Sequence, residues 1–275
     1  MIAWLAGDEK TEDAFATEVY SRTINIHAQD PIYLLASLID ADVPCLCVLP
    51  ELKRVAFYTA TKLTPAGYHE LAKLPQLEQV TLSTETKEFL LGGHLESAAH
   101  LREVGFDTMT IDANMVAALN RLPRLKSLEF YGCDLSPGVL DRLQLPNLEH
   151  FNGMDSSLTN EHLAVIGKQR SLQVIDIQAS DITGDAYRHL AALPNLKELH
   201  TYGASIDDES AKCVKDMRSL TLLNIDWTEI TAPAVSKILK DCPRLVLRCN
   251  VQASGLTPAE QTEVKRRYDE WHARP

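Results

Sequence analysis

Leu122-Pro123-Arg124-Leu125 opens one of eight copies of a short unit that recurs about every 24 residues between Leu49 and Asp241. A fixed period of this size predicts a solenoid, in which each unit buries its apolar face against its neighbours. The other copies begin at Leu49, Leu74, Leu145, Gln169, Leu193 and Met217, with a degenerate copy expected near Ala98 and a closing unit at Cys242.

Two kinds of apolar spacing recur inside each unit. After Leu125, the residues Leu128 and Phe130 are two positions apart, which is the period of a β-strand. Leu140 and Leu143 are three positions apart, which fits one face of a helix. Each unit is therefore predicted to form a short strand, a turn and a return helix, with Ile175, Leu199 and Leu223 buried. Parallel strands are expected to pair in sequence order, beginning near Leu52, Leu77, Leu101, Leu125, Leu148, Leu172, Leu196 and Leu220.

The arrangement closely resembles the leucine-rich-repeat family, whose Leu-x-x-Leu-x-Leu pattern is carried here by Leu220, Leu223 and Ile225. Ile182-Thr183 and Cys242-Pro243-Arg244-Leu245 are similar to the cysteine-containing, ribonuclease-inhibitor-like subclass. The resemblance implies an α/β solenoid with a curved parallel sheet on the concave side and helices on the convex side. Ala204 departs from the Asn or Cys that the family often has at that turn, so a continuous side-chain ladder is not implied.

The ends of the chain do not follow the repeat and are interpreted as caps. Residues 1–48 are expected to be an N-terminal helical cap, with one helix over Glu9–Tyr20 and another after Asp30-Pro31 that carries Ile32, Leu35, Leu38 and Ile39. Residues 49–241 hold the eight repeats. Residues 242–275 form the closing repeat and a C-terminal helical cap that begins at Leu256-Thr257-Pro258 and places Val264, Tyr268 and Trp271 on one face.

Composition and charge exclude several classes of partner. A net charge of −11 argues against nucleic acid and anionic membranes, which need a basic surface. The start of the sequence lacks the pattern of a secretory signal, and no apolar stretch is long enough to span a membrane. Free cysteines behave as small buried hydrophobes, so the six Cys indicate a reduced cytoplasmic interior. Gly92-Gly93 predicts a loop in the irregular segment 83–97.

No motif of catalysis or metal binding is present. The usual zinc spacings, a phosphate-binding Gly-rich loop and a Gly-x-Ser-x-Gly elbow are all missing from the sequence. We therefore expect a non-enzymatic protein without a cofactor or a structural metal. The alternative enzyme hypothesis is a hydrolase assembled across repeats from His150, Asp176 and His200.

The concave face is the remaining candidate for function, because equivalent positions of stacked parallel strands form rows along it. These rows mix Tyr, Trp and Met with carboxylates and contain no Lys or Arg, a composition typical of an interface for a basic protein or peptide. The predicted contact residues are Glu129, Tyr131, His150, Asn152, Met154, Asp155, Asp176, Gln178, Glu198, His200, Tyr202, Asn224, Asp226 and Trp227.

Two roles fit such a surface. The resemblance allows an inhibitor or immunity protein that neutralises a basic effector such as a nuclease, since some leucine-rich-repeat inhibitors block such enzymes with the same face. The second role is an adaptor that recruits targets through its first 48 residues.

Overall fold

The computed structural model describes residues 24–25, 32–34, 39–46, 53–57, 62–75, 77–83, 98, 100–249 and 255–273. The chain divides into two compact units, Met1–Glu129 and Phe130–Pro275. The same strand–turn–helix repeat builds both units.

Five strands of the first unit are hydrogen-bonded in sequence order: β1 (Ile24–Asn25), β2 (Ile32–Leu34), β3 (Arg54–Phe57), β4 (Gln79–Leu82) and β5 (Glu103–Asp107). β1 pairs with β2 antiparallel, whereas β2 to β5 are parallel. The register aligns Val55 with Val80 and Val104, and all three side chains are buried. Residues of the repeat that are 24 or 25 positions apart therefore stack in the core.

Two helices of the first unit begin at polar capping residues. The 3-10 turn η1 (Asp40–Asp42) leads into α3 (Val43–Leu46), and α4 (Pro65–Ala72) and α6 (Ala113–Leu119) follow later strands. The hydroxyl of Thr64 accepts a hydrogen bond from the Ala66 N–H, and the Asp112 carboxylate accepts two from the first turn of α6. These bonds satisfy N–H groups that a helix N-terminus leaves without an intrahelical partner. The short strand β6 (Thr110–Ile111) precedes α6, and β7 (Ser127–Tyr131) runs across the boundary between the units.

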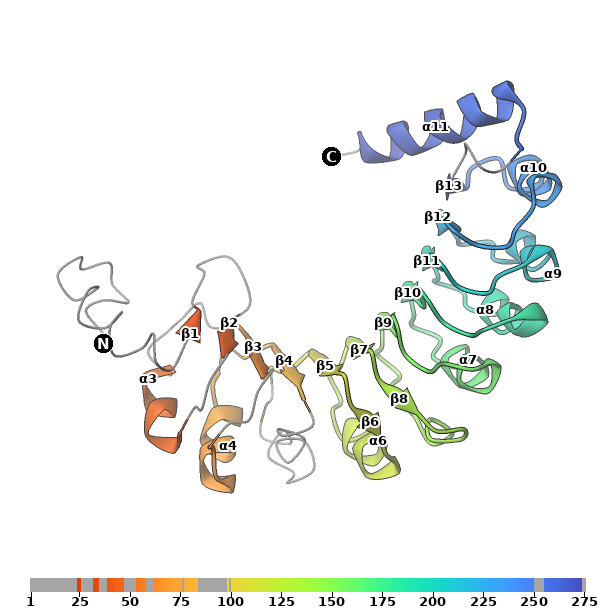
Figure 1. Cartoon of the computed structure of the whole chain (residues 1–275). Coiled ribbons are helices and arrows are strands. Elements are labelled where there is room, and N and C mark those ends of the chain that lie inside the picture. The colour runs from red at the N-terminus through yellow and green to blue at the C-terminus, as the bar shows by residue number, and fades with distance from the viewer. Residues whose placement is uncertain are drawn as a thin grey trace. The chain divides into compact units, whose positions relative to one another are not determined.

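The second unit has strands β9 (His150–Asn152), β10 (Val174–Asp176), β11 (Glu198–His200), β12 (Leu222–Asn224) and β13 (Val246–Arg248). All neighbouring pairs are parallel and follow sequence order, as the sequence predicts. Figure 1 shows the strands of this unit on the inner side of an arc and its helices on the outer side. Besides the short strand β8 (Asp134–Leu135), the unit contains α7 (Asn160–Ile166), η4 (Gly184–Tyr187), α8 (Arg188–Ala191), α9 (Asp208–Ala211), η5 (Val214–Asp216), α10 (Ala232–Asp241) and α11 (Pro258–His272).

The core of the second unit is a stack of apolar side chains taken from one position of each repeat. The strand register aligns Phe151, Ile175, Leu199, Leu223 and Leu247, and each of these side chains is at most 1% exposed. The predicted burial of Ile175, Leu199 and Leu223 is confirmed. Burial of apolar area along this row stabilises the stack, and no repeat could bury its own row alone. The fold is a leucine-rich-repeat solenoid of the α/β class.

The repeat that begins at Leu122 does not form the helix predicted for it. Residues 137–142 are a series of turns, although Leu140 and Leu143 are buried as expected. Pro137 provides no N–H for a helical bond, and Gly138 has a φ of 75°, which lies outside helical conformation. The apolar spacing is therefore fulfilled by turns rather than by a helix.

The helix predicted after Asp30-Pro31 is also wrong where the structure describes it. Ile32–Leu34 is the strand β2, which hydrogen-bonds to β3 on one side and to β1 on the other. A bare edge strand leaves its N–H and C=O groups unpaired, and β2 supplies partners that a helix could not. The predicted helix at Glu9–Tyr20, Leu35 and Leu38, and most of the irregular segment 83–97 lie outside the described residues.

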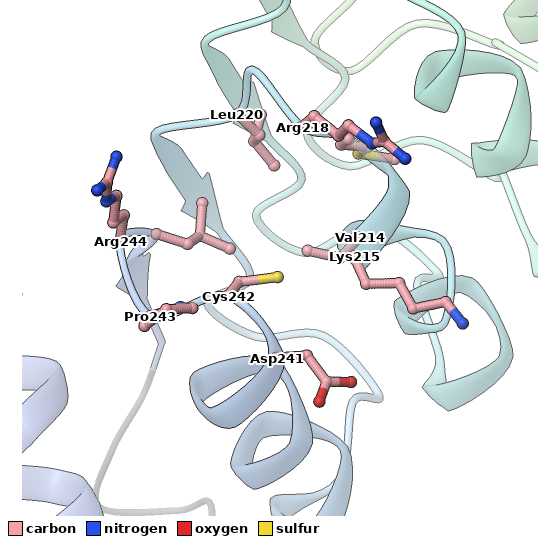
Figure 2. Close-up of a pocket in the computed structure, with 10 residues that line it drawn as sticks. Val214, Lys215, Arg218, Leu220, Asp241, Cys242, Pro243 and Arg244 are labelled. Carbon is pink, nitrogen blue, oxygen red and sulfur yellow. The ribbon is translucent and has the colours of Figure 1, made fainter.

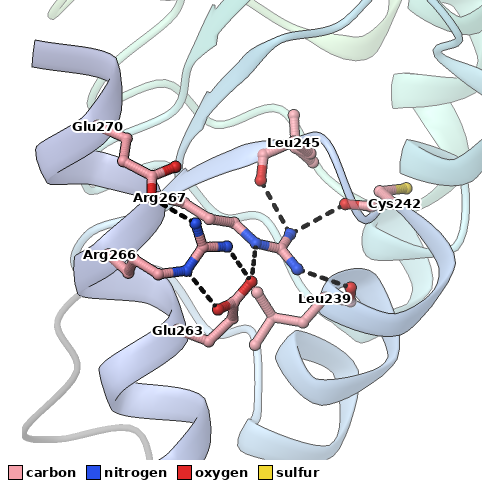
Figure 3. Close-up of polar contacts among 7 residues, drawn as sticks. All are labelled: Leu239, Cys242, Leu245, Glu263, Arg266, Arg267 and Glu270. Carbon is pink, nitrogen blue, oxygen red and sulfur yellow. Dashed lines mark hydrogen bonds and ion pairs between the residues drawn. The ribbon is translucent and has the colours of Figure 1, made fainter. Parts of the chain in front are cut away.

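The C-terminal helix forms where the sequence predicts it. Thr257 and Glu260 make a capping box at the start of α11, and Val264 is buried. The Arg267 guanidinium donates to the carbonyl oxygens of Leu239, Cys242 and Leu245 at the end of α10 and the following turn (Figure 3). Arg267 thus fixes α11 to the closing repeat while satisfying carbonyl groups at the end of α10.

None of the helices that the described residues form is both long and apolar enough to cross a membrane.

Candidate partner-binding surface

The candidate surface is the concave face of the second unit, and three rows of side chains follow from its strand register. The first row holds His150, Val174, Glu198, Leu222 and Val246, and the second holds Asn152, Asp176, His200, Asn224 and Arg248. A third row holds Tyr131, the last residue of β7, and Met154, Gln178, Tyr202 and Asp226, which each follow their strand by two residues. Because the strand residues that alternate with these rows fill the core, the rows lie on the solvent side of the sheet, although Leu222, Asn224 and Val246 are themselves buried.

Three aromatic side chains of this unit are exposed: Tyr131, Tyr202 and Trp227, called the aromatic trio below. Their exposed fractions are 47%, 40% and 69%, whereas Phe130, the residue before Tyr131, and Phe151 in the next repeat are buried. The trio are the exposed large hydrophobic residues of the part of the chain that the structure describes. Met154 is half-buried between Tyr131 and Tyr202 in the third row. The prediction that these rings project from the concave face rather than fill the core is consistent with this exposure.

Trp227 and Asp155 stand at a special position of the repeat. Both have a positive φ, of 59° and 56°, and so does Ala179 between them at 51°. Each follows the third row directly, where the chain turns away from the strand, and Gly132 and Gly203 occupy the same position in other repeats. The N–H groups of Asp155 and Ala179 donate to Gln178 and Tyr202 of the next repeat, so the turn continues the backbone ladder. The recurring glycines are a signal in the sequence for this turn, but the spacing of apolar residues does not reveal it.

Three polar side chains of the second row are hydrogen-bonded to the backbone of the turn that follows them. The side chains of Asn152, Asp176 and Asn224 each accept a hydrogen bond from the N–H two residues further on. Such bonds shape the turn after each strand. Asn224 is only 4% exposed, so little of its side chain is open to a partner, and its role as a contact residue stays a prediction. Its side chain holds the backbone of Asp226.

The acidic character of the surface is reduced at one end. Arg248, from the closing repeat, lies beside Asn224 in the second row and pairs with Asp226 at 2.9 Å. In the repeats that begin at Leu122 to Met217 the rows contain no Lys or Arg, as the sequence indicates, but the prediction did not include the closing repeat. Asp155, Asp176 and Glu198 remain as the acids of the surface. The Glu198 carboxylate lies 3.5 Å from the His200 Nε2.

A cleft of about 730 Å³ adjoins Asp226 and Arg248, between β13 and α11. Tyr268 and Lys265 of α11 form its other wall. The surface that carries the exposed rings therefore adjoins, at Asp226, a cleft lined in part by charged residues.

Glu129 is the last residue of the first unit, whereas the other predicted contact residues belong to the second unit. It is half-buried, and one of its carboxylate oxygens lies close above Gly105. Burial raises the pKa of Glu129, the neighbouring Glu103 raises it further, and Arg54 partly opposes both effects.

The residues of the hydrolase hypothesis do not form a catalytic arrangement. The register places Asp176 beside His200, but the Asp176 carboxylate bonds to the backbone and side chain of Gln178, and His200 lies against Glu198. His150 is an exposed residue of the first row.

Four cysteines within the described residues, Cys133, Cys213, Cys242 and Cys249, are free thiols. Burial raises the pKa of Cys213 and Cys242, and that of Cys249 to about 11, which disfavours the reactive thiolate. No group of three metal-ligating side chains occurs among the residues that the structure describes. Cys45 lies in α3, and Cys47 is outside the described part of the chain.

The parallel strands in sequence order and the buried rows of stacked repeats define a leucine-rich-repeat fold. No protein-family model and no curated protein matches the sequence. Among solved structures, the chain is similar to an internalin (inlF) from Listeria monocytogenes str. 4b F2365, with 12% identity and a TM-score of 0.44 over 78% of this chain and 71% of that one. The fold class rests on the strand register within each unit.

Proposed function

We propose that the concave face of the second unit binds a basic protein or peptide and that the chain acts through this binding rather than through catalysis. The observation that carries the proposal is the exposure of the aromatic trio on a sheet whose opposite face is buried. Exposed rings cost solubility unless they are covered, and Tyr and Trp are enriched at the energetic centres of protein interfaces.

The spacing of the trio suits a macromolecular partner. Tyr131 and Tyr202 belong to one row and are three repeats apart, which corresponds to about 14 Å at the usual separation of strands. Trp227 follows one repeat further along. A small molecule could not contact all three rings, whereas one face of a protein or an extended segment could.

The charges of the surface support a basic partner. Asp155, Asp176 and Glu198 lie among the rings, and the whole chain has a net charge of −11. Such charges attract a basic partner during encounter and repel an acidic one. The finer role that we favour is inhibition of a basic effector by covering its active surface, as an immunity protein does.

The test begins with immobilised wild-type chain and a Tyr131→Ala/Tyr202→Ala/Trp227→Ala variant exposed to the same cell extract. Quantitative mass spectrometry should identify a basic protein that the wild type retains and the variant loses. With that protein purified, each single truncation should weaken binding by about 1–4 kcal/mol, chiefly through faster dissociation.

Charge reversal gives a separate readout. Asp155→Lys should slow association and reduce its dependence on salt, because exposed charges act mostly on encounter. Glu161→Lys is the matched control, since Glu161 is an exposed acid in the first turn of α7 on the helical side. Equal association rates for the two variants, together with unchanged binding by the triple variant, would rule out the concave face as the binding site.

A further inference from the structure

A second surface of the second unit has the opposite charge. A pocket of about 250 Å³ lies between the repeat that begins at Met217 and the closing unit (Figure 2). Its apolar lining includes Val214, Met217, Leu220 and Leu245, all of which are buried. This volume is below the roughly 300–1,000 Å³ of most small-molecule sites and suits a single side chain.

Three cations line the pocket: Lys215, Arg218 and Arg244. All three are exposed, and the charge of Lys215 adds a small part to the lowering of the Asp241 pKa, after Lys237 and Lys240. Lys212 and Lys237 nearby are paired with Glu209 and Asp241. Asp241 is the acidic residue of the lining, and its bond to Lys237 holds its pKa below the usual range. The pocket is therefore positive, although the chain as a whole is acidic.

The directions of these side chains indicate the kind of anion that would fit. Figure 2 shows Arg218 and Arg244 extending away from the pocket on opposite sides, with Lys215 on the side of Arg218. A single phosphate or carboxylate needs donors that converge on one point. Donors that diverge around an apolar pocket instead suit several carboxylates on either side of one apolar side chain.

We propose that this pocket docks an acidic segment of a partner protein, which inserts one apolar side chain and places carboxylates on the flanking Arg218, Arg244 and Lys215. The site is independent of the concave face, and it gives the chain two surfaces for partners of opposite charge. A chain that holds a basic protein on one surface could in this way be recruited by an acidic segment on another.

The test uses the full chain and a fluorescein-labelled peptide, Glu-Asp-Glu-Leu-Glu-Asp-Glu, with fluorescence anisotropy at about 0.15 M salt, where the Debye length is about 8 Å. The wild-type chain should bind the peptide saturably. Arg218→Glu/Arg244→Glu should weaken binding about tenfold or more, because both flanking cations become repulsive. Replacing the peptide's Leu by Ala should also weaken binding, since the apolar contact is lost.

Lys168→Glu/Arg170→Glu is the matched control. Both residues are exposed, Arg170 opens an earlier repeat as Arg218 opens its own, and the change in net charge is the same. This control should bind the peptide within about twofold of the wild type, because charges beyond a Debye length are largely screened. Circular dichroism should show both double variants folded.

Three outcomes would overturn the proposal: no saturable binding of the Leu peptide, equal binding of the Leu and Ala peptides, or equal loss in the two double variants. Light scattering tests a different occupant. If the wild-type chain self-associates and Arg218→Glu/Arg244→Glu abolishes this association, the pocket belongs to an interface between copies of the chain. None of these results depends on the aromatic trio, so failure here leaves the proposal for the concave face untouched.

Discussion

At the scale of single residues, Trp227 combines two features that are rarely found together. It has the most exposed ring among the described residues, and its backbone is in the left-handed region that favours glycine. A non-glycine residue in this region costs roughly 1–2 kcal/mol. An exposed tryptophan with a strained backbone lowers both solubility and stability. Contact between its ring and a partner would explain why it is there, and this agrees with a place in the binding surface.

Trp227→Gly should therefore be more stable than Trp227→Ala by about 1 kcal/mol, because only glycine adopts this φ without strain. Urea unfolding of the two variants measures the difference. Gly203→Ala is the control at the same position of the preceding repeat, where an added Cβ meets no atom within 4 Å. It should lose stability through backbone conformation alone. Equal stability of Trp227→Gly and Trp227→Ala would mean that the turn is not strained.

Tyr187 is a second residue whose surroundings make a prediction. Its side chain is fully buried, and its hydroxyl has no hydrogen-bond partner among the described residues. Burial raises the pKa of Tyr187 above its usual value, and Asp207 adds to the shift. In the unfolded chain this tyrosine ionises near pH 10, whereas in the folded protein it stays protonated to higher pH. The folded state then holds more protons, so stability falls as pH rises above about 10.

Tyr187→Phe should reduce this loss of stability at alkaline pH and should cost little at pH 7, because it removes a buried polar group without a partner. Unfolding midpoints measured between pH 7 and 11 check the prediction. Tyr202→Phe, which removes the hydroxyl of an exposed ring, is the control variant. A large loss of stability for Tyr187→Phe at pH 7 would show that the hydroxyl does have a partner.

At the scale of elements, one side chain of α11, Arg267, hydrogen-bonds to the end of α10 and to the closing repeat. Arg267 donates to three carbonyl oxygens and to Glu263, and its side chain is 10% exposed. The neighbouring Arg266 bonds to Glu263 and Glu270 on the exposed side of the same helix (Figure 3). Hydrogen bonds from Arg266 first and then Arg267 lower the pKa of Glu263 to about 2.

Arg267→Met should destabilise the second unit by about 2–3 kcal/mol, because it leaves carbonyl groups at the end of α10 without their charged donor. Arg266→Met is the matched control and should have no measurable effect, since exposed ion pairs contribute little. Thermal unfolding of both variants compares them directly. Similar melting temperatures for the two would show that apolar packing, rather than Arg267, holds α11.

At the scale of the whole molecule, the solenoid must close its last strand. β13 pairs with β12 on one side and packs against α11, and Val246 and Leu247 are buried. Without α11 this strand would present unpaired backbone groups and apolar side chains to solvent. Terminal units with a polar outer side keep repeat proteins soluble.

A chain that ends at Cys249 should therefore associate or aggregate where the full chain does not. Light scattering at several protein concentrations detects this association. A chain that ends at Ala273 is the control, because it keeps all of α11. A truncated chain with the same scattering and the same melting temperature as the control would show that α11 is not a cap.

The sequence by itself determined the repeat, the places of β3, β4, β5, β7 and β9 to β12, the buried rows and the exposed rings. These features follow from the spacing of apolar residues, which decides locally whether a side chain faces the core or solvent. The C-terminal helix was predictable for the same reason, because Thr257, Pro258 and Glu260 are local signals of a helix start.

Only the tertiary structure decided which partners the polar side chains bond to and how the edge strands of the sheet are covered. The buried side chain of Asn224 bonds to the turn that follows it, and Asp226 forms an ion pair with Arg248 of the next repeat. The periodicity of the sequence aligns these residues, but it does not specify the bonds between them. Ile32–Leu34 became a strand because the edge of the sheet needed hydrogen-bond partners, a demand that arises only after β3 has formed. Local spacing encodes which side of an element is buried, whereas the partners of each polar group depend on chain segments brought together by folding.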